Sequence, residues 1–205
     1  MKKRIPNSEY EKVLDTFEKY YVLVPLEVFA DPFEILVSTI MSARTNDDTT
    51  LPAAKRLFKK AHTIDQLLQL DESEIAKLIF PVGFYKTKAK NILKMAQQVK
   101  ETFEGKIPDT REELESLAGV GRKTANLTLN RAFKKPAIAV DTHVHKITNW
   151  LGWVDTKTPL ETERELSKTV PQKYWTDMNR LFVSIGRQFR TEKRIKEFLR
   201  ENDLL

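Results

Sequence analysis

Two residues near the middle of the chain, Lys123 and Asp141, have the types and the spacing of a nucleophile and a carboxylate partner. Lys123 lies two residues after the turn Gly119–Gly121, at the expected start of a helix that runs to Phe133. A lysine with an accessible free amine attacks electrophilic carbon and forms Schiff bases. The positive end of the helix dipole and the adjacent Arg122 disfavour its ammonium form. The alternative is a solvated or phosphate-binding lysine.

Chain geometry allows Asp141 to return to Lys123. The roughly eleven helical residues from Lys123 to Phe133 rise about 16 Å, and the roughly eight residues that end at Asp141 span up to about 26 Å when extended. Pro136 interrupts helix in that stretch. Asp141 is also well placed to cap a following helix, Thr142–Trp150. The capping role and the chemical role are compatible.

The segment around Lys123 is predicted to form a helix, a Gly-x-Gly turn and a second helix. Glycines let the backbone turn tightly and approach another backbone closely. The free N–H groups and the dipole at the start of the second helix form a phosphate site, which grips DNA without reading its sequence. A purely structural hairpin is the alternative for the glycine pair alone. The DNA contacts expected here are Gly119, Val120, Gly121, Arg122 and Thr124.

The elements that must position these residues are helices. Apolar residues recur at three- to four-residue spacing along most of the chain, and capping signals precede many of these stripes. The clearest signals are Asp31-Pro32, Asp71 with Glu74, Thr110 with Glu113, and Thr158-Pro159 followed by Glu161. The apolar stretch Pro136–Val140 is short, and nothing obvious pairs with it as a strand. The pattern predicts an all-α protein of about ten helices.

Composition narrows the class of protein. The chain has 205 residues, of which 40% are hydrophobic and 31% charged, a balance typical of a soluble globular protein with one or two small domains. No apolar run approaches the roughly 20 residues of a membrane helix, so we expect a cytoplasmic protein. The net charge of +6 favours a polyanionic partner such as nucleic acid, although a soluble basic surface explains it equally well.

The chain has no cysteine. Disulfides, thiol catalysis and thiolate-ligated zinc or iron–sulfur sites are therefore excluded. His143 and His145 lack a third ligand at any recognised spacing, so we expect no metal site. His143 is instead expected to make a polar contact with DNA near Asp141.

Residues 117–126 (LAGVGRKTAN) and 136–144 (PAIAVDTHV) resemble the endonuclease III branch of the helix–hairpin–helix DNA glycosylases, and look most similar to archaeal-type members. Lys123 and Asp141, 18 residues apart, match the catalytic pair of that family. The resemblance covers roughly residues 8 to 190 and extends to residues 31–37, 41–47, 81–89 and 149–152.

The resemblance implies a two-lobed helix–hairpin–helix glycosylase fold. Residues 25–134 would form a helical barrel that ends in the hairpin, and residues 1–24 with 135–205 would form the second lobe. The partner would be double-stranded DNA with a damaged base or an abasic site, bound by a monomer associated with the nucleoid.

The function implied is that of a bifunctional glycosylase and abasic-site lyase that uses no cofactor. The damaged nucleotide is flipped out of the stack, Lys123 attacks C1′ of its sugar, and Asp141 stabilises the charge that develops there. Beta-elimination then nicks the strand. Substrates would be oxidised pyrimidines such as thymine glycol. The alternatives are a glycosylase for alkylated purines or mismatched uracil or thymine, and a non-catalytic DNA-binding module, against which the presence of both Lys123 and Asp141 argues.

Two departures from the family pattern matter. Members usually carry four cysteines that hold an iron–sulfur cluster, and this chain has Arg190, Glu197 and Arg200 near three of those positions. We expect the basic segment with Arg190, Lys193 and Arg194 to replace the cluster by packing and by touching phosphate, the alternative being a solvated basic helix. Many relatives also have glutamine where this chain has Arg44, which we expect to fill the gap left by the flipped base. Asn46 and Asp47 are expected DNA contacts of the same loop.

Overall fold

A computed structural model describes residues 5–205, and over these residues the chain is built from helices without a β-strand. The prediction of an all-α fold is therefore confirmed. The chain divides into two compact units, one of which is Pro25–Lys135, while the other joins the N-terminal segment up to Val24 to Pro136–Leu205. The first four residues of the expected second lobe lie outside the described residues.

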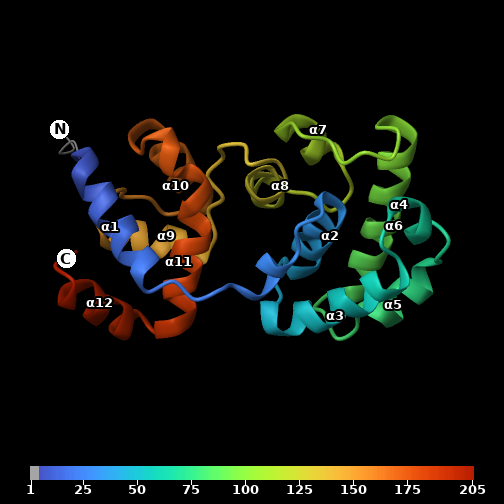
Figure 1. Ribbon diagram of the computed structural model, residues 1–205, viewed down its shortest axis with the longest axis horizontal. Helices are drawn as coiled ribbons and strands as arrows, with labels where there is room; N and C mark the ends of the chain where they lie inside the picture. Colours follow the sequence, from blue (N-terminus) through green and yellow to red (C-terminus); the bar gives the residue numbers. More distant parts are fainter. Residues whose placement is uncertain (1–4) are drawn as a thin grey trace. The chain divides into compact units, whose positions relative to one another are not determined.

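The unit Pro25–Lys135 is organised around one buried helix (Figure 1). Its elements are η1 (Pro25–Val28), α2 (Pro32–Ser42), α3 (Asp47–Lys60), α4 (Ile64–Leu67), α5 (Glu72–Ile79), α6 (Tyr85–Thr102), α7 (Arg111–Ser116) and α8 (Arg122–Phe133). Every residue of α2 from Ile35 to Met41 is buried, as expected of a helix surrounded by neighbours. Helix α8 packs against α2, and α6 packs against both α2 and α5.

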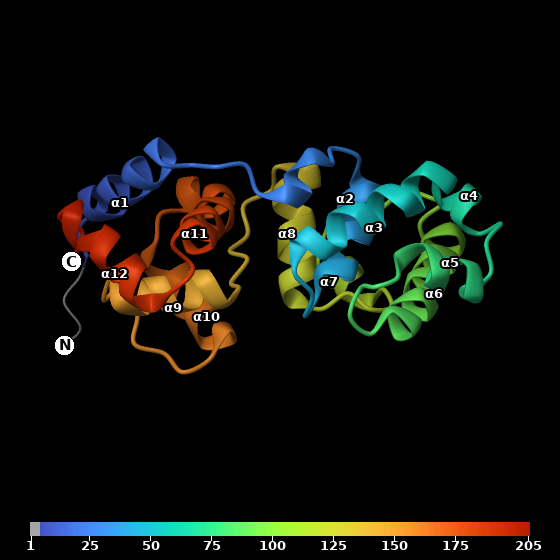
Figure 2. The same cartoon turned by 90° about the horizontal axis from the view of Figure 1, so that it is seen from below.

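The other unit has its own core. Its helices are α1 (Asn7–Lys19), α9 (Thr142–Trp150), α10 (Pro159–Thr169), the short η2 (Gln172–Tyr174), α11 (Trp175–Phe189) and α12 (Glu192–Glu201). Figure 2 shows α1 and α12 from the two ends of the sequence within this unit. The rings of Phe17 and Phe182 meet edge to face at 4.9 Å, so α1 and α11 share one aromatic core.

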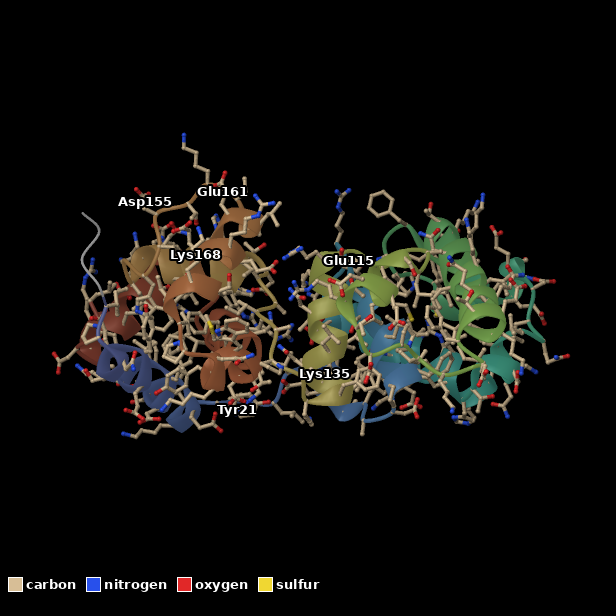
Figure 3. The ribbon with its side chains drawn as sticks, turned by 90° about the horizontal axis from the view of Figure 1, so that it is seen from above. Tyr21, Glu115, Lys135, Asp155, Glu161 and Lys168 are labelled. Atoms are coloured by element: carbon tan, nitrogen blue, oxygen red, sulfur yellow. The ribbon has the colours of Figure 1, made fainter. Side chains whose placement is uncertain are left out.

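Side-chain contacts also fix the chain at the edges of each unit (Figure 3). Arg180 of α11 lies over the ring of Tyr21, 4.9 Å from its centroid, and so holds the segment that follows α1. In the unit Pro25–Lys135, Lys135 pairs with Asp109 at 2.8 Å and also donates to the Asp109 carbonyl. This contact joins the end of α8 to the segment before α7, so the two helices are held at the end opposite their turn.

The expected helix starts are capped by the side chains of the residues that precede them. Asp31 accepts hydrogen bonds from Phe33 N and Glu34 N, with Pro32 as the first helical residue. The segments that begin at Asp71 and Thr158 are both reciprocal capping boxes. Within the described residues, no helix is both long and apolar enough to cross a membrane.

Candidate functional site

The turn between α7 and α8 is held by one glycine with a special backbone and by one side chain of α6. Gly119 has φ +79°, and a Cβ there would lie 3.0 Å from Cβ of Asn91, so both its conformation and its close packing favour glycine. Gln98 accepts a hydrogen bond from Ala118 N at 2.8 Å and donates to Ser116 O at 3.2 Å. Sequence reasoning missed Gln98, because nothing in its local pattern distinguishes it from other polar residues of α6.

The second glycine has a different role. Gly121 has φ −101° and ψ 175°, which any residue adopts, and a Cβ there would meet no atom within 4 Å. It is the N-cap residue of α8, where no side chain caps the helix and no acidic residue stands in the first turn. The start of α8 therefore has open space beside Gly121. This is the arrangement that binds phosphate at a helix N-terminus.

The side chains of the first turn of α8 differ in exposure. Arg122 and Lys123 are exposed, and the Lys123 amine makes no hydrogen bond or ion pair with any described residue. Thr124 is only 7% exposed, so the backbone N–H is the group through which it would contact DNA. Val120 is also buried, at 7% exposure, and serves the turn as an apolar anchor.

Asp141 lies in the other unit and caps α9. Its Oδ1 accepts a hydrogen bond from Val144 N at 2.9 Å, so the expected capping role is confirmed. The residues before it, Ala137 to Val140, are buried and belong to no helix or strand, and Ala139 O accepts a hydrogen bond from Asn179 of α11 at 3.0 Å. Asp141 itself is half-buried. Within the described residues, its Oδ2 has no hydrogen-bond partner, which leaves one carboxylate oxygen for another role.

The two histidines of α9 have different surroundings. A Cβ built on Gly186 of α11 would come within 2.0 Å of His143 Nδ1, so the imidazole lies directly against the backbone of α11. His145 instead shares a hydrogen bond of 2.6 Å with Thr162 of α10. Over residues 5–205, no three His, Asp or Glu side chains cluster as metal ligands would.

The segment between α2 and α3, residues 43–46, forms an exposed loop, called here the 43–46 loop. Arg44 lies at its centre with φ +56°, and its guanidinium makes no hydrogen bond or ion pair with any described residue. The Asn46 side chain caps α3, accepting a hydrogen bond from Asp48 N at 2.8 Å, so part of its hydrogen-bonding capacity serves the fold. Asp47 is the first residue of α3.

An aromatic residue that sequence reasoning did not single out lies next to this loop. Phe84 is 66% exposed and has φ +57° as the N-cap residue of α6. Its neighbour Gly83 donates a hydrogen bond from its backbone N–H to Thr45 Oγ1 at 3.1 Å, which joins the two loops. A bulky apolar side chain in a turn that contains both glycine and proline was the available signal.

The C-terminal helix α12 closes the core of its unit by apolar packing. Ile195, Phe198 and Leu199 are buried, and the Phe198 ring stacks on Phe189 with centroids 4.5 Å apart. Arg190, Lys193 and Arg194 are exposed, and Lys193 lies 3.9 Å from Glu197. With no cysteine in the chain, the donor set of an iron–sulfur cluster does not exist here, and aromatic packing occupies this part of the unit.

Comparisons with known proteins agree on one family. Residues 37–172 match the family described as the HhH-GPD superfamily base excision DNA repair protein. The chain is 46% identical over 158 residues to the endonuclease III of Thermotoga maritima, a match that covers 77% of this chain and 74% of the relative. It is 36% identical over 192 residues to the endonuclease III of Buchnera aphidicola, covering 93% and 89% of the two chains. A solved structure of a trapped endonuclease III–DNA covalent intermediate superposes with a TM-score of 0.83 at 33% identity, covering 92% of this chain and 90% of that one.

Proposed function

Since the chain belongs to the HhH-GPD superfamily of base excision DNA repair proteins and is an endonuclease III-type DNA glycosylase, we propose that it removes oxidised pyrimidines from double-stranded DNA and then nicks the strand as an abasic-site lyase. The observation that carries the lyase proposal is the amine of Lys123, which is exposed and makes no hydrogen bond or ion pair with the described residues. An amine that is accessible and held by no other contact can approach an electrophilic carbon, as Schiff-base formation requires.

The proposed chemistry begins with a covalent bond from Lys123 Nζ to C1′ of the flipped nucleotide. The C1′–N bond breaks at the same time, and the base leaves with the bonding electrons and is protonated. Opening of the sugar ring sends the C1′–O4′ electrons to O4′, which takes up the proton that Nζ loses, and leaves a protonated imine between Lys123 and C1′. Removal of a proton from C2′ then forms the C2′–C3′ double bond and breaks the C3′–O3′ bond, which releases the 3′ strand with its phosphate as the leaving group. Water then hydrolyses the imine and releases Lys123.

Asp141 is assigned two tasks in this scheme. Its carboxylate stabilises the positive charge that develops on the sugar as the base leaves, and it exchanges protons with the reacting groups. Support comes from its Oδ2, which has no hydrogen-bond partner among the described residues while Oδ1 caps α9. The cap holds the carboxylate in one orientation, which reduces the ordering needed in the transition state.

DNA binding is assigned to three features of the unit Pro25–Lys135. The uncapped start of α8 beside Gly121 would take a backbone phosphate. The exposed Arg44 would enter the space left by the flipped base, and the exposed ring of Phe84 would stack on a neighbouring base. In the other unit, His143, Arg190, Lys193 and Arg194 are proposed as further contacts. We propose that the enzyme acts as a monomer on the DNA of the cytoplasmic nucleoid.

The lyase proposal is tested by borohydride trapping on a duplex that contains an abasic site. Borohydride reduces the imine to a stable amine, so the wild type should give a covalent protein–DNA band. Lys123→Ala should give none, whereas Lys59→Ala, which alters an exposed lysine of α3 in the same unit, should trap like the wild type. An adduct that persists in Lys123→Ala, or that never forms with the wild type, would refute the assignment.

The substrate proposal is tested with duplexes that carry thymine glycol, an alkylated purine, or a mismatched uracil or thymine. Release of thymine glycol at the highest kcat/KM is the expected result. Faster release of an alkylated purine or a mismatched base would show a shifted specificity. DNA binding without release of any base and without trapping would identify a binding module.

A further inference from the structure

Lys88 of α6 is a buried lysine to which the proposed reaction gives no role. Its side chain is only 7% exposed. The ammonium donates to Met41 O at 2.7 Å, to Ala43 O at 2.6 Å and to Thr45 Oγ1 at 3.0 Å. An ammonium has three hydrogens to donate, so all of them are used. Burying a charge is costly unless it is hydrogen-bonded, and here neutral acceptors alone provide that compensation.

The acceptors show what Lys88 holds in place. Met41 is in the last turn of α2 and Ala43 is the C-cap residue of that helix, where carbonyl groups lack partners within the helix and the dipole end is negative. Thr45 is in the 43–46 loop that follows. Lys88 therefore donates hydrogen bonds to carbonyl groups at the end of α2. Its bonds to Ala43 and Thr45 also hold the loop against α6 on either side of Arg44.

The same loop is tied a second time through Thr45. The hydroxyl of Thr45 accepts a hydrogen bond from Gly83 N at 3.1 Å, and the Thr45 N–H donates to Ser42 O at 2.9 Å. A Cβ on Gly83 would lie 3.0 Å from Thr45 Oγ1, so the turn before α6 packs closely on the loop. Between these anchors Arg44 adopts φ +56°, a conformation that a residue with a side chain rarely takes without support.

We propose that Lys88 is a positioning residue, which fixes the 43–46 loop in the conformation that directs Arg44 into the DNA gap left by the flipped nucleotide. The inference rests on the proposed function. Without Lys88 the loop would have to be ordered when DNA binds. The free-energy cost of that ordering would lower the fraction of complexes in which the nucleotide is flipped out. Lys88 acts through the loop and does not touch the reacting atoms.

The test separates base release from the lyase step. Lys88→Met keeps the length of the side chain and removes every donor. On thymine glycol duplexes it should lower kcat for base release on the order of 10- to 100-fold, whereas borohydride trapping on an abasic duplex, which has no base to extrude, should stay close to wild type. Fluorescence of a 2-aminopurine next to the lesion should show a smaller flipping signal. Lys90→Met, an exposed lysine on the same helix, should behave as wild type.

A second variant keeps the test decisive if Lys88→Met fails to fold. Thr45→Val removes the hydroxyl that accepts from both Lys88 and Gly83 with little change in volume, and it should reproduce the selective loss in base release. A double-mutant cycle then identifies the route. If Lys88 acts through Arg44, then Arg44→Ala with Lys88→Met loses no more base release than Arg44→Ala alone.

Three results would overturn the inference: equal losses in base release and trapping in Thr45→Val, full base release in a folded Lys88→Met, or losses that add independently in the cycle. Failure of the proposed function is recognised separately, because the wild type would then give no trapped adduct on abasic DNA.

Discussion

The imidazole of His143 lies against the α-carbon of Gly186, so closely that a methyl group there would come within 2.0 Å of Nδ1 and 2.6 Å of Cγ. His143 is two residues from Asp141 in the first turn of α9, while Gly186 lies in α11. This contact packs the start of α9 against α11. It makes glycine necessary at position 186 as long as the ring keeps its place.

Gly186→Ala should therefore destabilise the protein by about 1–3 kcal/mol, the usual cost of overpacking a core. The free energy of unfolding, measured by urea denaturation, checks this. Combining the change with His143→Ala, which removes the ring, should recover most of the loss. If the two changes destabilise additively, the ring and the glycine are not packed together as described.

Asp141→Asn should separate the capping role of Asp141 from its proposed chemical role. Asparagine caps a helix about as well as aspartate, so the free energy of unfolding should stay within about 0.5 kcal/mol of wild type. Loss of the negative charge should lower base release by about 100-fold or more. Asp141→Ala is the matched comparison, since it loses the cap and should also lose about 1 kcal/mol of stability. Activity of Asp141→Asn close to wild type would remove Asp141 from the mechanism.

Alanine at the two glycines of the hairpin should have different effects, mainly on stability at Gly119 and mainly on DNA affinity at Gly121. Gly119→Ala forces a side chain into φ +79° and against Asn91, so it should cost about 1–2 kcal/mol of stability. Gly121→Ala has open space and an ordinary φ, so the stability should fall by no more than about 1 kcal/mol, the preference of an N-cap position for glycine over alanine. The added methyl group would stand beside the start of α8, which no side chain caps, and affinity for undamaged duplex, measured by fluorescence anisotropy, should fall. Unchanged affinity in Gly121→Ala would argue against a phosphate at this helix start.

The unfavourable contribution of Lys88 to the stability of the protein should diminish as the pH rises above about 8. Burial lowers the pKa of Lys88 from 10.5 to about 8 in the folded protein. Below pH 8 the lysine is protonated in both states, and the folded state carries the full cost of a buried charge. Between about pH 8 and 10.5 only the unfolded state keeps its proton, so this cost diminishes as pH rises. The free energy of unfolding should be measured for the wild type and for Lys88→Met at pH 7 and at pH 9.5. The difference between the two proteins should change by about 2 kcal/mol in favour of the wild type at the higher pH. A difference between the two proteins that does not change with pH would show that the lysine titrates normally.

Neutralising exposed basic residues near α12 should weaken DNA binding in a salt-dependent way. If Arg190 and Arg194 each contact a phosphate, replacing both with glutamine should reduce the slope of log K against log salt by about 1.8. Glutamine at Lys59 and Lys60, exposed at the end of α3, serves as the control. An unchanged slope would mean that Arg190 and Arg194 face solvent and contact no phosphate.

Local chemistry explains which parts of this fold could be predicted. The N-caps at Asp31, Asp71 and Thr158 were visible because capping residues lie within three positions of the groups that they bind. Helix α9 begins and ends at the expected residues, Thr142 and Trp150, since Asp141 caps it. The start of helix α6 at Tyr85 could not be predicted in this way. Its N-cap Phe84 takes a left-handed conformation and offers no capping side chain, so no local signal marked the start.

Tertiary contacts account for what the sequence could not reveal about the candidate site. Lys88 belongs to a helix whose other lysines are mostly exposed, and only the fold shows that it reaches α2. His143 and Gly186 are far apart in the chain, so their contact leaves no trace in local spacing. The prediction of a chemical role for Lys123 rests on its neighbours in sequence, the two glycines and Arg122. The prediction of Asp141 as its partner rests on the reach of the chain, which allows the pair, and on the family resemblance, which matches it.

The stacked rings of Phe189 and Phe198 have a consequence for the conditions under which the enzyme can work. Iron–sulfur clusters depend on a supply of iron and on enzymes that assemble them, and oxidants attack them. In this chain the end of α11 and helix α12 are held together by apolar side chains, and the sequence has no cysteine that could bind such a cluster. Oxidative stress creates the base lesions that such an enzyme would repair, and under that stress this chain has no metal centre of that kind to lose.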